Sequence, residues 1–260
     1  MAYKKLKYWF DKDLVIALAE KLSSNNSSYN KASLIQNIEL KLECLELKDR
    51  VELIADQLHK SFDYNYNLGL LQLIDILGPE NKSETGMFTE FYWVMPIAKY
   101  VEKYGINNFE KSMNAIEEIT KRNTGEYAIR PYILQHFDKT LKQMVKWSEY
   151  SNFHIRRLAS EGVRPRLPWA KKLDIFIEDP KPIIPILNNL KDDKSKYVQK
   201  SVANCLNDIL KDNFSIGKEI IESWNTNEIT KERQWIIKHA LRNLIKKEDK
   251  WALKIIKINN

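Results

Sequence analysis

Apolar residues recur at spacings of three and four along almost the whole chain, which is the pattern of amphipathic helices. Only 7 of the 260 residues are glycine, and no segment shows the strict apolar and polar alternation of a half-buried strand. We therefore predict an all-α protein. The polar breaks SSNNSSYN and GPENKSETG are too short to be domain linkers, so residues 1–260 are predicted to form a single helical domain.

Six helices are predicted in the first half of the chain from continuous apolar patterns. They cover residues 14–22, 31–45, 47–62, 67–78, 88–105 and 107–123.

The second half contains an internal repeat. The segments FHIRRLASEGVR, KYVQKSVANCLN and QWIIKHALRNLI align without gaps at offsets of 43 and 38 residues, and each follows another amphipathic segment. Two columns of this alignment are apolar: one holds Ile155, Val198 and Ile236, and the other holds Ala159, Val202 and Ala240. A period near 40 residues is typical of HEAT-like helical pairs. We therefore predict an α-solenoid whose second helices line a concave face.

The charge pattern favours a polyanionic partner. Lys and Arg number 42 against 35 Asp and Glu, giving a formal net charge of +7. In the repeat alignment Arg157, Lys200 and Lys238 share one column, so three successive inner helices would offer a cation at the same height. Such a row suits the phosphates of a duplex, and it predicts a basic groove. An ordinary solvated lysine-rich face gives the same pattern.

The stretch HIRRLASEGVRPRLPWA combines charges, prolines and a tryptophan. On a helix, Arg157, Glu161 and Arg164 lie on one face, at spacings of four and three. Because Pro165 follows Arg164, the helix is predicted to end near there, and RPRLP becomes a stiff turn that presents Trp169. A carboxylate flanked by cations should be ionised. The alternative is a surface ion pair plus a core tryptophan.

A second polar series occurs in SVANCLNDILKDN, where Asn204, Asp208 and Asp212 are four residues apart. We predict that Asn204 faces the groove and that the two aspartates pair locally with Lys200 and Lys211.

Several classes of protein are disfavoured by the sequence. Cys44 and Cys205 lie in apolar-patterned surroundings and are predicted to be buried, reduced thiols, which indicates a cytoplasmic protein. The four histidines lack metal-ligand spacing, and no phosphate-binding glycine motif is present, so neither a metal nor a nucleotide cofactor is expected. No uncharged span approaches the length that crosses a membrane, so no membrane association is expected.

Three segments together carry a family resemblance. GEYAIRPYI, RRLASEGVRPRLPWA and YVQKSVANCLNDILKDN, within residues 125–213, resemble the AlkC branch of the AlkC/AlkD family of bacterial HEAT-repeat DNA glycosylases. The resemblance implies hydrolytic excision of cationic N-alkylated bases from duplex DNA, chiefly 3-methyladenine and also 3-methylcytosine. It implies a monomeric, cytoplasmic bacterial enzyme that works at the nucleoid without a cofactor. Some relatives carry a C-terminal immunoglobulin-like domain, which we do not expect here.

The resemblance also assigns roles to individual residues. The family's functional carboxylates and tryptophan fall on Glu126, Glu161 and Trp169, with Glu161 as the main electrostatic stabiliser or water-positioning base. The residues predicted to contact DNA are Arg130, Arg157, Arg164, Arg166, Lys200, Asn204, Lys238 and Arg242.

Alternative interpretations stay open at this point. Glu126 also fits the first turn of a helix capped by Thr124. A rival function is a DNA-binding or scaffold module that keeps the fold without the chemistry, although the presence of all three functional residues argues against it. A protein-binding solenoid would instead show apolar or mixed-charge columns on its concave face.

Overall fold

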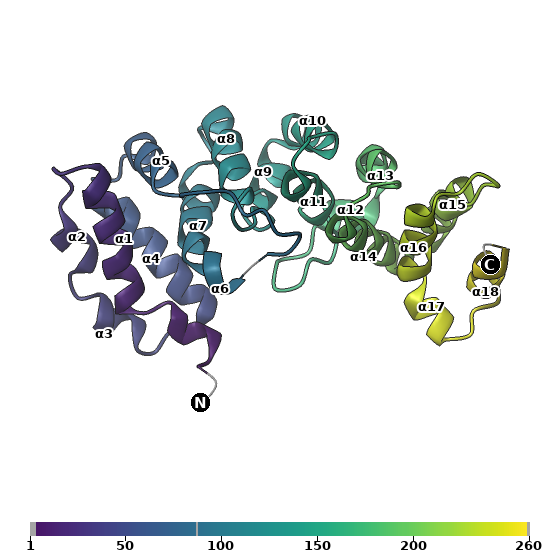
Figure 1. The fold of residues 1–260 in the computed structure, drawn as a ribbon, viewed down its shortest axis with the longest axis horizontal. Helices are drawn as coiled ribbons and strands as arrows, with labels where there is room; N and C mark the ends of the chain where they lie inside the picture. Colours follow the sequence, from purple (N-terminus) through teal and green to yellow (C-terminus); the bar gives the residue numbers. More distant parts are fainter. Residues whose placement is uncertain (1–3, 87, 259–260) are drawn as a thin grey trace. The chain divides into compact units, whose positions relative to one another are not determined.

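The computed structural model describes residues 4–86 and 88–258. Every regular element in these two ranges is a helix, which confirms the all-α prediction. The chain divides into two compact units, Met1–Tyr132 and Ile133–Asn260 (Figure 1). The grouping of residues 1–260 into one domain therefore stays a prediction.

The N-terminal unit holds eight α-helices and two short 3-10 helices among its described residues. They are η1 Leu6–Trp9, α1 Lys12–Asn25, α2 Lys31–Ile35, α3 Ile38–Leu42, α4 Leu47–Ser61, α5 Tyr66–Asp75, α6 Phe88–Phe91, η2 Tyr92–Val94, α7 Met95–Tyr104 and α8 Phe109–Thr120. A further helix, α9 Arg130–Gln135, contains the boundary between the units.

Two helices predicted as continuous are broken. The helix predicted over residues 31–45 is divided into α2 and α3 because Asn37 adopts a left-handed backbone with φ of 59°. The helix predicted over residues 88–105 is divided into α6, η2 and α7. Pro96 lies in the first turn of α7, where the absent N–H of proline costs nothing but an earlier helix cannot continue smoothly.

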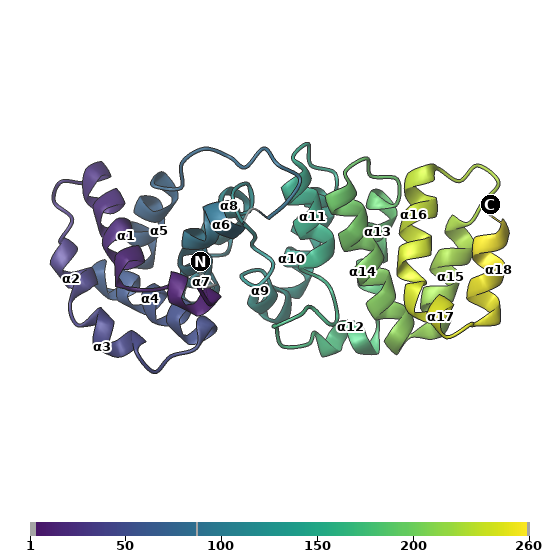
Figure 2. The same cartoon turned by 60° about the horizontal axis from the view of Figure 1, so that its bottom comes forward.

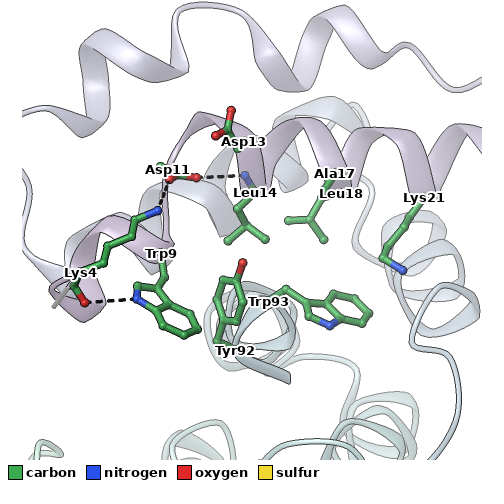
Figure 3. Close-up of a pocket in the computed structure, with 10 residues that line it drawn as sticks. All are labelled: Lys4, Trp9, Asp11, Asp13, Leu14, Ala17, Leu18, Lys21, Tyr92 and Trp93. Carbon is green, nitrogen blue, oxygen red and sulfur yellow. Dashed lines mark hydrogen bonds and ion pairs between the residues drawn. The ribbon is translucent and has the colours of Figure 1, made fainter. Parts of the chain in front are cut away.

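The N-terminal unit contains a pocket of about 400 Å³ beneath α1 (Figure 3). Trp9, Tyr92 and Trp93 contribute aromatic rings to its lining, and the Lys21 ammonium lies 4.8 Å from the centroid of the Trp93 ring. The residues that line this pocket do not include any predicted site residue.

The C-terminal unit contains the repeat. Its helices are α10 Phe137–Ser148, α11 Phe153–Glu161, α12 Asp174–Glu178, η3 Lys181–Ile183, α13 Ile184–Leu190, α14 Lys196–Asp212, α15 Phe214–Trp224, α16 Lys231–Ala240, α17 Arg242–Lys246 and α18 Lys250–Ile258. Within this unit α11, α14 and α16 pack in series. The helices α10, α13 and α15 lie along one side of this series (Figures 1 and 2).

Burial confirms the repeat alignment. All six residues of the two apolar columns are completely buried, namely Ile155, Val198, Ile236, Ala159, Val202 and Ala240. The two alanines and one valine in the second column are small enough for neighbouring inner helices to approach closely. Three successive helical pairs therefore share one continuous core, as the helical-repeat prediction requires.

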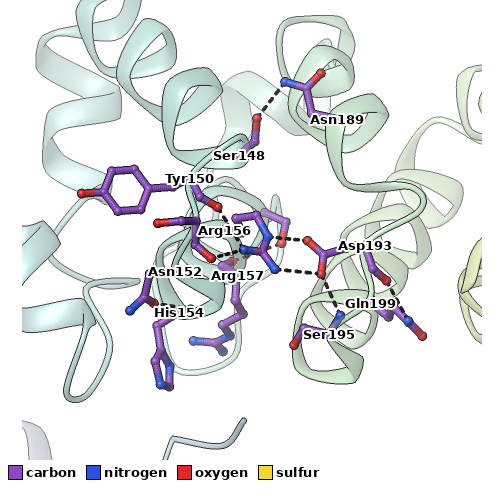
Figure 4. A network of polar contacts seen from close by, with 12 residues as sticks. Ser148, Tyr150, Asn152, His154, Arg156, Arg157, Asn189, Asp193, Ser195 and Gln199 are labelled. Carbon is purple, nitrogen blue, oxygen red and sulfur yellow. Dashed lines mark hydrogen bonds and ion pairs between the residues drawn. The ribbon is translucent and has the colours of Figure 1, made fainter. Parts of the chain in front are cut away.

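Arg156 joins the first of these pairs to the second (Figure 4). Its Nε and Nη2 donate to the two carboxylate oxygens of Asp193, at 2.6 and 3.2 Å. Its Nη1 donates to the backbone carbonyls of Tyr150 and Ser151. Asp193 also accepts the backbone N–H of Ser195, which leads into α14. The start of α11 is thus tied to the start of α14 through one guanidinium.

We expect Arg156→Ala to destabilise the C-terminal unit by about 1–3 kcal/mol, since it leaves the buried Asp193 carboxylate without its cation. Urea unfolding followed by circular dichroism measures the change. Lys12→Ala, which removes an exposed ion pair with Glu39, is the control and should hardly move the midpoint. Equal effects of both changes would contradict the role given to Arg156.

Candidate functional site

Glu161 is the last residue of α11 and is 5% exposed. The helix starts with a side-chain cap, in which Asn152 accepts the backbone N–H of His154, and it ends on Gly162. It ends three residues before the predicted end near Arg164, because the backbone N–H of Arg164 turns back to the Glu161 carbonyl. The carboxylate is therefore buried at a helix end.

Two arginines converge on one oxygen of this carboxylate. Arg164 Nη1 lies 2.7 Å from Glu161 Oε1, and Arg157 Nη2 lies 3.6 Å from the same atom. The three residues are brought together as predicted, but Arg164 lies beyond the end of α11 and not on a shared helix face. Burial alone would raise the pKa of Glu161, but the positive charges of both arginines and a hydrogen bond from Ser201 outweigh it and lower the pKa. Glu161 is accordingly an ionised, buried carboxylate.

Arg164 is shared with a second carboxylate. Its Nε donates to Asp208 Oδ2 at 2.9 Å, and its Nη2 lies 3.4 Å from Oδ1. Burial raises the pKa of Asp208, Arg164 opposes this rise, and the negative charge of Glu161 adds to it. One guanidinium therefore bridges two buried carboxylates whose pKa values shift in opposite directions.

The predicted local pairs of the α14 aspartates are wrong. Asp208 pairs with Arg164, and Asp212 pairs with Arg166 through two bonds of 2.6 and 2.7 Å. The lysines expected as their partners, Lys200 and Lys211, are exposed. Packing of α14 against the segment after α11 brings arginines more than 40 residues away closer than lysines on the same helix. Both arginines of VRPRL are thus held by α14.

The segment from Pro165 to Leu173 forms a closed loop that displays Trp169. The backbone N–H of Leu173 donates to the Pro165 carbonyl at 3.0 Å, which closes the loop. Trp169 has a left-handed backbone with φ of 63°, and it is 68% exposed. The interpretation of Trp169 as a core residue is therefore wrong, and the predicted presentation by a proline-containing turn is confirmed.

Glu126 and Arg130 belong to the N-terminal unit and are both buried, at 8% and 6% exposed. Thr124 caps the backbone N–H of Glu126 and donates its hydroxyl to the Glu126 carboxylate at 3.0 Å. A Cβ on Gly125 would lie 2.7 Å from Ile116 Cγ2, so glycine permits this close approach to α8. The cap supports a local structural role for Glu126, and its participation in a site with Glu161 stays a prediction.

Two of the three cations in the repeat column are exposed. Lys200 and Lys238 are on the surface, whereas Arg157 is half-buried, with its guanidinium 5.0 Å from the centroid of the Tyr197 ring. Arg242 donates to the side-chain carbonyl of Asn204 at 3.0 Å. Burial and then the charge of Arg164 lower the pKa of Arg242. The C-terminal unit therefore carries cations on α11, α14, α16 and α17.

Lys196 is a further cation in this part of the C-terminal unit, and the sequence analysis did not identify it. Lys196 Nζ lies 3.4 Å from the centroid of the Trp235 ring, which stacks on His239. The spacing of Trp235 and His239, four residues apart on one helix face, is a signal for such stacking. Lys196 lies on α14, in the preceding helix pair, so its contact with Trp235 on α16 could not be predicted from local spacing.

The metal and membrane predictions concern residues 4–86 and 88–258, the part of the chain that the structure describes. In these ranges no three His, Cys, Asp or Glu side chains are arranged to hold a metal ion. No helix there is long and apolar enough to span a membrane. Cys205 is buried as predicted, but Cys44 is exposed, because it lies beyond the end of α3 instead of within a helix.

Comparison with known proteins reveals close relatives. The family described as DNA alkylation repair enzyme matches residues 97–244. The uncharacterized protein YhaZ of Bacillus subtilis is 37% identical over 257 residues, covering 98% of this chain and 69% of that protein. The Pseudomonas fluorescens alkylpurine DNA glycosylase AlkC, bound to DNA containing an abasic site analog, superposes with a TM-score of 0.88. It is 34% identical, covering 98% of this chain and 69% of that one.

The fold and the site define a helical-repeat protein with an ionised, arginine-paired carboxylate and a loop-mounted, exposed tryptophan. The matched residues 97–244 include Glu126, Glu161 and Trp169. The chain belongs to the family of DNA alkylation repair enzymes, which confirms the resemblance noted in the sequence.

The lowered pKa of Glu161 predicts how stability depends on pH. A carboxyl whose pKa is lower in the folded than in the unfolded protein stabilises the fold above its ordinary pKa of 4.5, and this contribution is lost as pH falls through the folded value. We expect Glu161→Gln to be less stable than the natural protein at pH 7. The difference should shrink as pH falls below 4.5.

Urea unfolding of both proteins between pH 3 and 7, at constant ionic strength, measures this difference in unfolding free energy. A difference that stays constant, or grows towards acid pH, would show that Glu161 is not held ionised by its arginines.

Proposed function

We propose that this chain is a DNA glycosylase that excises cationic N-alkylated bases, chiefly 3-methyladenine and also 3-methylcytosine, from duplex DNA. Family membership supports DNA alkylation repair, and the similar Pseudomonas protein is an alkylpurine DNA glycosylase bound to DNA. The observation that carries the proposal is the buried Glu161 carboxylate, which its arginines keep ionised.

The chemistry of alkylated bases suits such a carboxylate. Alkylation at N3 leaves the base positively charged, so it departs without prior protonation. The step that needs help is the development of positive charge on the deoxyribose, which a fixed negative charge stabilises. The same carboxylate can orient a water molecule towards the sugar carbon and accept its proton. The products are the free base and an abasic site, and this reaction uses neither a metal nor a cofactor.

Two other residues complete the proposed catalytic set. Trp169, exposed on its loop, is assigned to contact the lesion or its deoxyribose, where an aromatic face favours a cationic base. Glu126, whose carboxylate accepts the Thr124 hydroxyl, is assigned as the partner of Glu161.

The proposed DNA contacts are mainly cations that bind backbone phosphates. They are Arg130, Arg157, Arg166, Lys200, Asn204, Lys238 and Arg242. Arg164, which the sequence also predicted to contact DNA, is buried between Glu161 and Asp208 and is assigned to Glu161 instead of a phosphate. Arg166 donates hydrogen bonds from Nε and Nη2 to Asp212. Because a guanidinium has five N–H donors, this ion pair orients Arg166 without using all of its donors. In this proposal the chain acts as a monomer with its basic surface along the duplex.

The direct test is release of free bases from methylated duplex DNA, separated chromatographically under single-turnover conditions. We expect the natural protein to release 3-methyladenine and Glu161→Gln to release it at least about 10²-fold more slowly, the scale of losing one preorganised electrostatic group. Trp169→Ala should also slow release. Binding of DNA without any release by the natural protein would favour a non-enzymatic DNA-binding module instead.

The phosphate contacts predict a steep salt dependence. Each neutralised phosphate contributes about −0.9 to the slope of log binding constant against log salt for duplex DNA. We expect Lys200→Ala and Lys238→Ala each to reduce the slope by about one. Fluorescence anisotropy with undamaged duplex DNA measures the slope, with the exposed Lys31→Ala in the N-terminal unit as the control. Unchanged slopes in both lysine variants would remove these residues from the DNA-binding surface.

A further inference from the structure

We propose that Asp208 is a positioning residue for Glu161: it holds Arg164 in the orientation that keeps Glu161 paired, without itself touching DNA. The proposal rests on the proposed function, because it assigns Asp208 to the carboxylate that stabilises the deoxyribose. Asp208 lies on α14, in the repeat that follows the one carrying Glu161.

The geometry ties Arg164 from both sides. Nη1 donates to Glu161 Oε1 at 2.7 Å, while Nε donates to Asp208 Oδ2 at 2.9 Å. The three side chains are nearly inaccessible, with exposures of 5% for Glu161, 7% for Arg164 and 8% for Asp208. Because a guanidinium is planar and its donors diverge, the Nε contact fixes the direction in which Nη1 points.

The function of the contact follows from what Arg164 would otherwise do. Arg164 precedes Pro165 in a segment that departs from α11, so its backbone alone does not direct the side chain to Glu161. A long, flexible cation near a polyanion would turn to the nearest phosphate. Asp208 supplies a buried competing anion, and it therefore keeps Arg164 with Glu161 when DNA is present.

The negative charge of Asp208 also affects the pKa of Glu161 directly. This direct effect is opposite in sign to the effect of positioning Arg164. The charged groups around Glu161 are Arg157 on α11, Arg164 on the following segment and Asp208 on α14. Arg164, Arg166 and Arg242 are cations that interact with Asp208, and the backbone N–H of Arg166 also donates to its carboxylate. Removing the negative charge of Asp208 alone would lower the pKa of Glu161, whereas releasing Arg164 would raise it. The two effects are thus separable by sign.

Asp212 provides a matched control. It lies one helical turn further along α14 and makes the same kind of paired contact with an arginine of the same segment. Its partner, Arg166, has no ion pair with Glu161. An effect specific to Asp208 therefore separates positioning of Glu161 from general support of the segment.

The experiment compares the pH dependence of single-turnover release of 3-methyladenine in the natural protein, Asp208→Asn and Asp212→Asn. The acid limb is the fall in rate at low pH as Glu161 becomes protonated. We expect Asp208→Asn to move this limb to higher pH by about one unit, which corresponds to a tenfold increase in the proton affinity of Glu161. Its rate should fall while its affinity for undamaged DNA is not weakened. Asp212→Asn should leave the acid limb in place.

Other outcomes would overturn the proposal. A downward shift in Asp208→Asn would mean that only its charge matters, and an unshifted limb with a uniformly lower rate would mean a purely structural role. Arg164→Lys keeps the charge but cannot bridge both carboxylates, so it should shift the limb upward as well. The double variant, which combines Asp208→Asn with Arg164→Lys, should shift the acid limb no further than the single variants do. Arg164→Lys carries the test alone if Asp208→Asn does not fold, and an unshifted limb there would contradict the proposal.

A second readout does not depend on excision. In ¹⁵N-labelled protein the Arg164 Nε–H, identified by its absence in Arg164→Lys, should exchange slowly with solvent, because it is buried against Asp208. We expect the signal to be lost in Asp208→Asn and kept in Asp212→Asn. Persistence in Asp208→Asn would overturn the positioning role. Loss of this signal in Asp208→Asn, in a protein whose natural form releases no base, would instead show that the proposed function has failed while the positioning contact holds.

Discussion

The candidate site of the C-terminal unit depends on the guanidinium of Arg164, which is held between the carboxylates of Glu161 and Asp208. A buried ion pair is a poor source of stability, since desolvation costs about as much as the attraction returns. Its retention here makes sense as a device for specificity, because it fixes one orientation of one carboxylate. Ala159 on α11 and Val202 on α14 are completely buried, and the two helices pack directly against each other.

The repeat architecture explains how such a site is assembled. Arg156 and Asp193 lock the beginning of α11 to the beginning of α14, and Arg164 and Asp208 lock the end of α11 to the far part of α14. These two ion pairs, one near each end of α11, oppose sliding and rotation of α11 against α14. The Glu161 carboxylate therefore lies on a rigid pair of elements, which favours electrostatic preorganisation over adjustment on binding.

Sequence patterns predicted the positions of the helices better than they predicted the ion-pair partners of the polar side chains. Apolar periodicity located the helices and the two buried repeat columns, and spacing grouped Arg157, Glu161 and Arg164 correctly. Spacing failed for Asp208 and Asp212, whose arginines lie more than 40 residues away, because only packing decides between local and distant partners. It also failed at Asn37, where a single left-handed residue ends a helix inside an otherwise unbroken apolar pattern. The proposed pairing of Glu126 with Glu161 rests on the family resemblance, because spacing along the sequence does not predict it.

The left-handed backbone at Trp169 has a consequence for recognition. Conformations of this kind cost about 1–3 kcal/mol in a residue other than glycine, and they persist only where the surrounding chain enforces them. The closed loop and its prolines enforce this one before any ligand is present. A large aromatic ring that already points into solvent loses little conformational freedom on contact. Its surface is therefore available to a partner as a rigid, ready-made platform, much as a preorganised binder presents its anchor residue.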